Sequence, residues 1–202
     1  MTLSSIQRYA DLAARILALP ATVPRMIAVD GPGGAGKSAF AARLSAALGG
    51  APIVHTDDFA SWDNPIDWWE RLQRQVVDPL AAGCTARYQR YDWDQRGLAE
   101  WHNVPLAPVV LIEGMSSARR AIATRLALAV WMHTPRSLRL KRGLKRDGAE
   151  ALPRWESWMA AEDAHFLADR TIDRCAVLVD GAPTIAHDAE RDFIRLAACA
   201  YV

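Results

Sequence analysis

The sequence predicts a doubly wound α/β fold, in which helices cover both faces of a central parallel sheet. Two observations carry this prediction. Five short apolar segments alternate with stretches of helical periodicity, and a glycine-rich turn joins the first segment directly to a helix. Parallel strands need long crossovers, usually helices, so this alternation is typical of a parallel sheet. The expected strands are residues 26–30, 52–56, 109–113, 127–132 and 175–179.

The segments between these strands have the spacing of amphipathic helices. A first helix is expected over residues 4–18 and ends at Pro20. Further helices are expected over residues 37–48, 66–78, 117–125, 136–147, 154–168 and 184–199. A chain of 202 residues fits one domain, taken here as residues 1–202 with residues 1–20 as its N-terminal helical segment. Residues 84–108 are polar and aromatic. We therefore expect this segment to be an excursion on the substrate side that contacts a ligand, rather than a segment that only fills out the fold.

Composition excludes several functional classes. The 24 basic and 23 acidic residues leave a net charge of +1, so neither nucleic-acid nor membrane-surface binding through bulk charge is expected. No apolar run reaches the length of a membrane span. Arg8, Asp11 and Arg15 interrupt the N-terminus, unlike a signal peptide. Three widely spaced cysteines indicate neither a disulfide framework nor a zinc site. A cytoplasmic protein is expected, and its oligomeric state is not predicted.

The glycine-rich turn, residues 31–38, matches the phosphate-binding pattern G-x-x-x-x-G-K-[ST] in full. A buried strand precedes it and an Ala/Leu-rich helix follows, as the pattern requires. Such a loop turns successive N–H groups toward phosphate oxygens, beside a helix N-terminus. Lys37 is expected to reach the β- and γ-phosphates, and the Ser38 hydroxyl to bind Mg²⁺. The residues expected to hold a nucleoside triphosphate are Gly31, Gly33, Gly34, Ala35, Gly36, Lys37, Ser38 and Ala39.

Two carboxylates follow expected strands, where ligands bind in open parallel sheets. Asp57, after the second strand, can orient an acceptor hydroxyl and take its proton during phosphoryl transfer. Alternatively, Asp57 or the adjacent Asp58 caps a helix. Glu113, at the end of the third strand, can hold a Mg²⁺-bound water. Its alternative is a strand-end acid that faces solvent.

A basic helix is expected after the fourth strand, in a segment (residues 136–148) that could form a lid. Arg139, Arg142 and Arg146 recur at i, i+3 and i+7 and therefore share one helix face. Three guanidiniums there can stabilise charge on a transferring phosphoryl group. The alternative is a solvated charged face.

Taken together, these motifs resemble the uridine kinase branch of the P-loop kinases, which also includes phosphoribulokinase and bacterial pantothenate kinases. The phosphate loop, Asp57-Asp58-Phe59, Tyr91-Asp92-Trp93, Ile112-Glu113-Gly114 and the arginine helix occur in that family's order, across roughly residues 25–181. The resemblance implies a P-loop fold with strand order 2-3-1-4-5. It also implies ATP and Mg²⁺ as cofactors and a nucleoside as small-molecule substrate, phosphorylated at its 5′-hydroxyl.

The resemblance also assigns roles to individual residues. Asp57 is the implied base, and Tyr91 and Asp92 lie against the nucleoside. Gly181 passes near the adenine of ATP. The remaining implied substrate residues are Phe59, Trp93 and Arg96. Where the family has Thr-His-Ser-Arg after the Tyr-Asp-aromatic turn, this chain has Asp94-Gln95-Arg96-Gly97, so Arg96 stands in for the arginine and no histidine matches.

Three further hypotheses remain open from the residues. The acceptor could instead be pantothenate, a sugar or a nucleoside monophosphate, whose phosphate Arg87 and Arg90 could bind. The chain could also be a nucleotide-binding regulatory module without an acceptor. Finally, Trp155, Trp158 and Glu162 share a helix face that either lines the ligand site or packs on the sheet, and the aromatic spacing favours packing.

Overall fold

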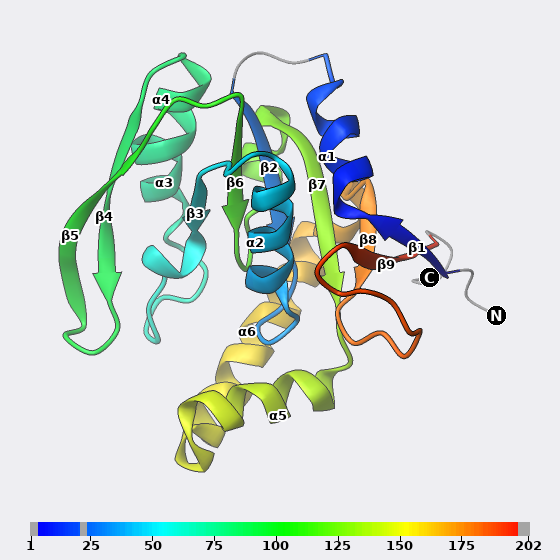
Figure 1. Cartoon of the computed structure of the whole chain (residues 1–202). Coiled ribbons are helices and arrows are strands. Elements are labelled where there is room, and N and C mark those ends of the chain that lie inside the picture. The colour runs from blue at the N-terminus through cyan, green and yellow to red at the C-terminus, as the bar shows by residue number, and fades with distance from the viewer. Residues whose placement is uncertain (1–3, 21–23, 198–202) are drawn as a thin grey trace.

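In a computed structural model, which describes residues 4–20 and 24–197, a seven-stranded sheet has helices on both faces and a two-stranded hairpin beside it (Figure 1). Five of the strands are parallel: β2 (Arg25–Asp30), β3 (Ile53–His55), β6 (Val109–Glu113), β7 (Leu126–His133) and β8 (Val177–Asp180). They lie in the order β3-β6-β2-β7-β8, which is the expected order 2-3-1-4-5. The predicted fold class is therefore confirmed.

The sheet has two strands more than expected. Strand β9 (Asp192–Leu196) pairs antiparallel with β8, and β1 (Ser4–Arg8) pairs antiparallel with β9. The helix expected over residues 4–18 therefore begins only at α1 (Tyr9–Leu17). The helix expected over residues 184–199 is wrong within the described part of the chain, and residues 198–199 lie outside it. Pairing between the two ends of the chain overrides the local helical pattern at both places.

Three long helices occupy the positions expected of them: α2 (Lys37–Ala47), α5 (Arg136–Asp147) and α6 (Leu152–Asp169). The helix expected over residues 66–78 is found over residues 69–81, where a π-helical turn, Gln73–Val77, joins α3 (Trp69–Leu72) to α4 (Asp78–Ala81). The helix expected over residues 117–125 is a 3₁₀ segment, Arg120–Arg125. Across residues 4–20 and 24–197, no helix combines the length and apolarity that crossing a membrane requires.

The substrate-side excursion of residues 84–108 contains an antiparallel hairpin. Its strands are β4 (Ala86–Asp92) and β5 (Gly97–Val104), which form a sheet of their own beside α3 and α4 (Figure 1). The buried residues Ala86, Tyr88 and Val104 pack the hairpin onto the core. The turn between the strands is thereby placed at the same end of the molecule as the carboxyl ends of β3 and β6 (Figure 1).

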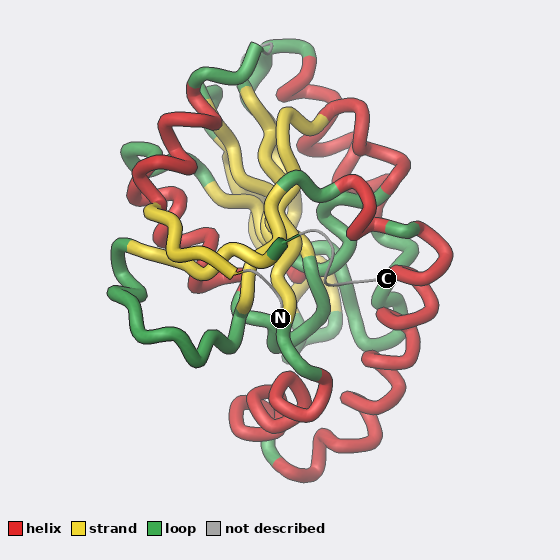
Figure 2. The backbone as a smooth tube through the Cα atoms, turned by 90° about the vertical axis from the view of Figure 1, so that its right-hand side faces the viewer, coloured by secondary structure: helices red, strands yellow, loops and turns green. Residues whose placement is uncertain are grey.

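The core has two sides because both faces of a parallel sheet are covered. Along β6, Leu111 packs on the side of α1 and α2 with Phe40, whereas Val110 and Ile112 pack on the other side with Leu72. Figure 2 shows the strands running between helices. Because side chains on both faces of β6 are buried, the strand is a continuous apolar run in the sequence.

The placement of β9 can be tested by truncating Phe193, whose buried ring lies 5.3 Å from the ring centroids of both Tyr9 and Phe40. We expect Phe193→Ala to lower the free energy of unfolding by about 3–5 kcal/mol, because it leaves a cavity among packed rings. Urea unfolding measures this change. The matched variant Arg191→Ala, at an exposed neighbour, should stay within about 0.5 kcal/mol of the parent. Equal effects of the two changes would contradict the placement.

Candidate active site

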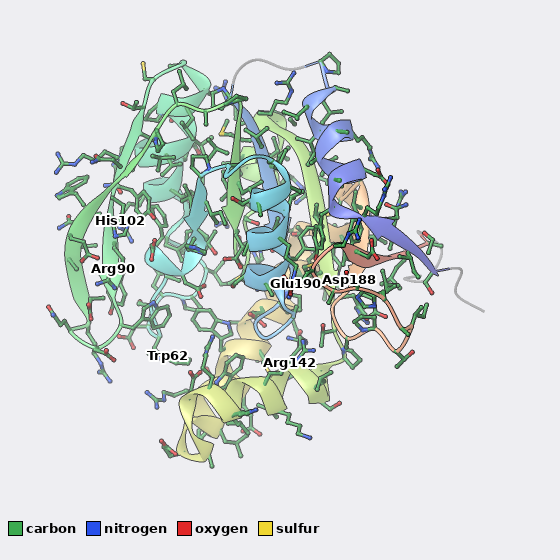
Figure 3. The ribbon with its side chains drawn as sticks, viewed as in Figure 1. Trp62, Arg90, His102, Arg142, Asp188 and Glu190 are labelled. Carbon is green, nitrogen blue, oxygen red and sulfur yellow. The ribbon has the colours of Figure 1, made fainter. Side chains whose placement is uncertain are left out.

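A cavity of about 1110 Å³ lies at the carboxyl ends of the parallel strands. It is lined by the phosphate loop, by the segments that follow β3 and β6, by α5 and α6, by the hairpin turn and by residues 179–194. Figure 3 shows Arg142 of α5 below the phosphate loop at this cavity, with Trp62 nearer the hairpin. We call the side formed by the loop and the segment 179–194 the donor end, and the indole-rich side next to the hairpin the acceptor end, after the phosphoryl donor and acceptor that the sequence predicts for them.

The phosphate loop lies too close to its neighbours to carry side chains at two positions. A Cβ atom at Gly34 would lie 2.7 Å from the Arg139 carbonyl oxygen, and one at Gly31 would lie 2.5 Å from the Met132 carbonyl oxygen. Both residues also have positive φ, +74° and +139°. Glycine is required here by backbone conformation and by space together.

The loop presents backbone donors in the way that an anion site requires. The N–H groups of Gly34, Gly36, Lys37 and Ser38 have no acceptor among the described residues, and α2 begins at Lys37. Helix N-terminal donors of this kind bind phosphate. The N–H of Gly33 differs, because it donates to Glu162 Oε1 at 2.7 Å. The Gly33 N–H is therefore engaged by a side chain of the protein, whereas the sequence predicted that it would contact phosphate.

Lys37, Ser38 and Glu113 come together at the floor of the cavity. The buried Lys37 ammonium donates to the Pro32 carbonyl at 2.9 Å. The Ser38 hydroxyl donates to Glu113 Oε1 at 3.1 Å, and His55 Nδ1 lies 2.6 Å from Glu113 Oε2. The hydrogen bond to Glu113 raises the pKa of His55 above its usual value.

The Ser38–Glu113 pair fits a Mg²⁺ site of the kind completed by substrate. Magnesium is usually held by one or two carboxylates together with phosphate oxygens and water. A hydroxyl and one carboxylate in contact supply the protein part of such a set. In the part of the chain that the structure describes, no group of three or more His, Cys, Asp or Glu side chains forms a self-sufficient metal site.

The two adjacent aspartates after β3 have different surroundings. Asp58 accepts a hydrogen bond from the Tyr88 hydroxyl at 2.7 Å, which ties it to the hairpin. The carboxylate of Asp57 has no hydrogen-bond partner among the described residues and meets the cavity. The surrounding protein raises the pKa of Asp57 by desolvation and Glu113 adds to this, whereas Lys37 opposes it. Asp57 is thus the aspartate available to a ligand.

The three arginines of α5 have different contacts, although their spacing predicts that they share one helix face. Arg142 donates to the carbonyls of Gly34 at 3.1 Å and Gly181 at 3.0 Å, so it ties the helix to both sides of the donor end. Arg146 lines the cavity and pairs with Asp147. Arg139 is buried behind the loop. Two of the three expected arginines therefore line the cavity, and one supports it.

Three indoles form the acceptor end. Trp62 lies 5.5 Å from both Trp93 and Trp158, and the latter two lie 5.9 Å apart, measured between ring centroids. Trp93 is oriented by its Nε1, which donates to the Asp57 carbonyl at 3.0 Å. Arg96 and Arg154 also line this end. A flat ring can stack on such indoles, in the same cavity as the unengaged carboxylate of Asp57.

The remaining expected substrate residues fall into two groups. Tyr91 lines a smaller adjoining cavity of about 420 Å³, which Trp62 and Trp158 also line. Phe59 is buried and stacked on Tyr88. Asp92 accepts from the N–H groups of Asp94 and Gln95 in its own turn. Phe59 and Asp92 therefore shape the site from outside and do not line it.

The arginines proposed for a phosphate-bearing acceptor are also engaged elsewhere. Arg87 stacks on Trp101, and Arg90 pairs with Glu100 and Asp92 on the hairpin. Figure 3 shows Arg90 and His102 on the hairpin, away from Arg142. Neither Arg87 nor Arg90 lines the cavity.

Sequence reasoning missed the role of Asp30, the last residue of β2. Its carboxylate is fully buried and accepts from three backbone N–H groups, those of Gly31 at 2.6 Å, Ser116 at 2.8 Å and Ala118 at 2.7 Å. Desolvation raises its pKa to about 6, although these hydrogen bonds oppose the shift. Asp30 joins the phosphate loop to the segment after β6. A charged residue that ends an otherwise apolar strand next to the loop was the available signal.

Comparison with known proteins identifies the fold. No protein-family model and no curated protein matches the sequence. The structure is similar to that of a possible uridine kinase from Bacillus stearothermophilus, with a TM-score of 0.65 and 20% identity over 84% of this chain and 96% of that one. It is equally similar, at 0.65 and 18% identity over 79% and 95%, to a protein of Silicibacter sp. TM1040 provisionally named a fructose transport system kinase. The chain has the P-loop kinase fold of these structures, as the sequence resemblance implied.

Removal of the Asp30 carboxylate should destabilise the protein. In Asp30→Ala, three buried N–H groups lose their acceptor, and each such loss costs about 1–3 kcal/mol. We expect the free energy of unfolding to fall by about 3 kcal/mol, with water in the vacated space offsetting part of the cost. Urea unfolding measures it, with the exposed Glu156→Ala as control. A fall below about 1 kcal/mol would refute the role assigned to Asp30.

The packing behind the phosphate loop can be tested with two glycines of similar φ. Gly34 and Gly49 have φ of +74° and +77°, but a Cβ at Gly49 would have no atom within 4 Å. Gly34→Ala should weaken Mg-ADP binding by about 10- to 100-fold, because strain of about 1–3 kcal/mol falls on the loop. Gly49→Ala should leave the affinity unchanged, as measured by calorimetry. Equal affinities for the two variants would contradict this account of the loop.

Proposed function

We propose that this protein transfers the γ-phosphoryl group of Mg-ATP to a hydroxyl group of a small molecule, with the 5′-hydroxyl of a pyrimidine nucleoside such as uridine or cytidine as the first candidate. One observation carries the proposal. The unengaged carboxylate of Asp57 shares a cavity with the open amides of the phosphate loop and stands beside a wall of three indoles.

Each group has a defined part in this reaction. The amides of the loop and Lys37 bind the triphosphate, and Arg142 and Arg146 neutralise charge on the phosphoryl group. Mg²⁺, held through Ser38 and Glu113, would lower the charge on the phosphate oxygens. Asp57 orients the acceptor hydroxyl and accepts its proton, and the surrounding indoles keep water away.

The acceptor end supports a ring-bearing substrate. Indole faces can stack on a nucleobase and can also contact the apolar face of a sugar. Arg96 and Arg154 have no carboxylate partner at hydrogen-bonding distance among the described residues, so their N–H donors can meet acceptors on the ring. A sugar is the second candidate, in line with the name given to the Silicibacter structure.

Release of ADP from Mg-ATP tests the proposal against a panel of nucleosides, nucleoside monophosphates, pantothenate and sugars. Lys37→Ala controls for contaminating kinases. Turnover with uridine or cytidine would support the first candidate, and turnover only with another member would replace the acceptor. No turnover with any member, while nucleotide still binds, would favour a regulatory module.

Asp57→Asn should lower acceptor-dependent turnover by about 10²–10⁴-fold and leave Mg-ADP affinity unchanged, since only the base is lost. Asp58→Asn is the matched control, because an amide oxygen still accepts from Tyr88. In the parent enzyme, kcat/KM should rise with pH as Asp57 loses its proton, at a pH above the ordinary aspartate range, because the pKa of Asp57 is raised. Full activity of Asp57→Asn would refute the mechanism.

A further inference from the structure

The carboxylate of Glu162 joins three separate parts of the site. It lies in the middle of α6 and is completely buried. Its Oε1 accepts from Gly33 N in the phosphate loop and from Trp158 Nε1 in the indole wall, both at 2.7 Å. Its Oε2 lies 3.4 Å from a guanidinium nitrogen of Arg139 on α5. One oxygen atom thus connects the donor end of the cavity with the acceptor end.

Arg139 extends this connection to the sheet. Its Nε donates to the Thr134 carbonyl after β7 at 3.2 Å, and its own carbonyl backs the loop at Gly34. The loop is therefore held on two successive residues, with Glu162 on the amide of Gly33 and Arg139 packed against Gly34. Movement of α6 along its axis would displace the loop and Trp158 together.

Stability alone does not account for a charged group at this position. Burial raises the pKa of Glu162, and Lys37, Gly33, Trp158 and Arg139 only oppose that shift. A buried ion pair is often no more stabilising than apolar side chains of similar volume. The hydrogen bonds of Glu162 do have fixed directions, however. These directions can set the relative positions of the phosphate loop, Trp158 and Arg139, which the bonds join.

We infer that Glu162 is a positioning residue that fixes the phosphate loop relative to the indole wall, and so sets the donor phosphate against the acceptor. The expected effect on turnover rests on the proposed kinase function. The hydrogen-bonded link between the phosphate loop and Trp158 does not, because it is present without any acceptor. A misplacement of about 1 Å between reacting groups can cost about 100-fold in rate, so a link of this kind affects catalysis more than binding.

The link itself is tested by tryptophan fluorescence and needs no acceptor. Mg-ADP should change the emission of Trp158, measured as the difference between the parent protein and Trp158→Phe. In Glu162→Leu, which removes the acceptor oxygen shared by Gly33 and Trp158, this Trp158 component should fall at least threefold, while calorimetry gives an Mg-ADP affinity within threefold of the parent. An undiminished Trp158 response in Glu162→Leu, or no Trp158 response in the parent, would overturn the inference.

Turnover provides the second test once the panel has supplied an acceptor. Glu162→Leu and Trp158→Phe should each lower kcat, by about 100-fold and about tenfold, with KM for ATP little changed. Trp158→Phe keeps an aromatic ring at this position and removes the N–H donor, so it tests the inference even where Glu162→Leu fails to fold. Loss of nucleotide affinity in parallel with kcat, or an unchanged kcat in Trp158→Phe, would show that Glu162 only supports the fold. Absence of turnover in the parent would reject the kinase function, and the fluorescence result would still decide the link.

Discussion

A phosphate loop needs support from its surroundings because its own residues supply few side chains. Here the open N–H groups lie on a turn whose glycines permit positive φ and contact with β7 and α5. Two buried carboxylates fasten the turn on either side. Asp30 holds its start to the segment after β6, and Glu162 holds Gly33 to α6. Both carry a charge into the core, where hydrogen bonds satisfy it, and the geometry of the donor end depends on them.

The parallel sheet then determines which carboxylates meet the loop. β6 lies between β2 and β3, so Glu113 is in register with Val29 on one side and His55 on the other. A side chain at that position can contact the first turn of α2 and the end of β3, as the bonds to Ser38 and His55 show. Asp57 follows two residues after His55. The strand order therefore places Ser38 and Glu113, the proposed metal-binding pair, in one cavity with Asp57, the proposed acceptor base.

The acceptor end is assembled differently, from segments that share no strand order. Trp62 follows β3, Trp93 belongs to the hairpin turn, and Trp158 belongs to α6. Their rings meet only because the hairpin and α6 pack against the same side of the sheet. Trp158 and Glu162 are one turn apart on α6, which lets an indole that faces the acceptor donate to a carboxylate that faces the loop. The end of the cavity proposed to bind the acceptor is thus built from the least regular part of the fold.

The sequence by itself determined the parallel strands, the phosphate loop and the candidate roles of Ser38, Asp57 and Glu113, because each depends on a short local pattern at the end of a buried strand. It did not determine β1 and β9, since their pairing joins residues nearly 190 positions apart and replaces two helical patterns. The positions of Phe59 and Asp92 away from the cavity lining, and the burial of Glu162, were likewise decided by tertiary contacts. A helical spacing shows which residues share a face, but only the packing of that face decides whether a carboxylate there meets water or a backbone N–H.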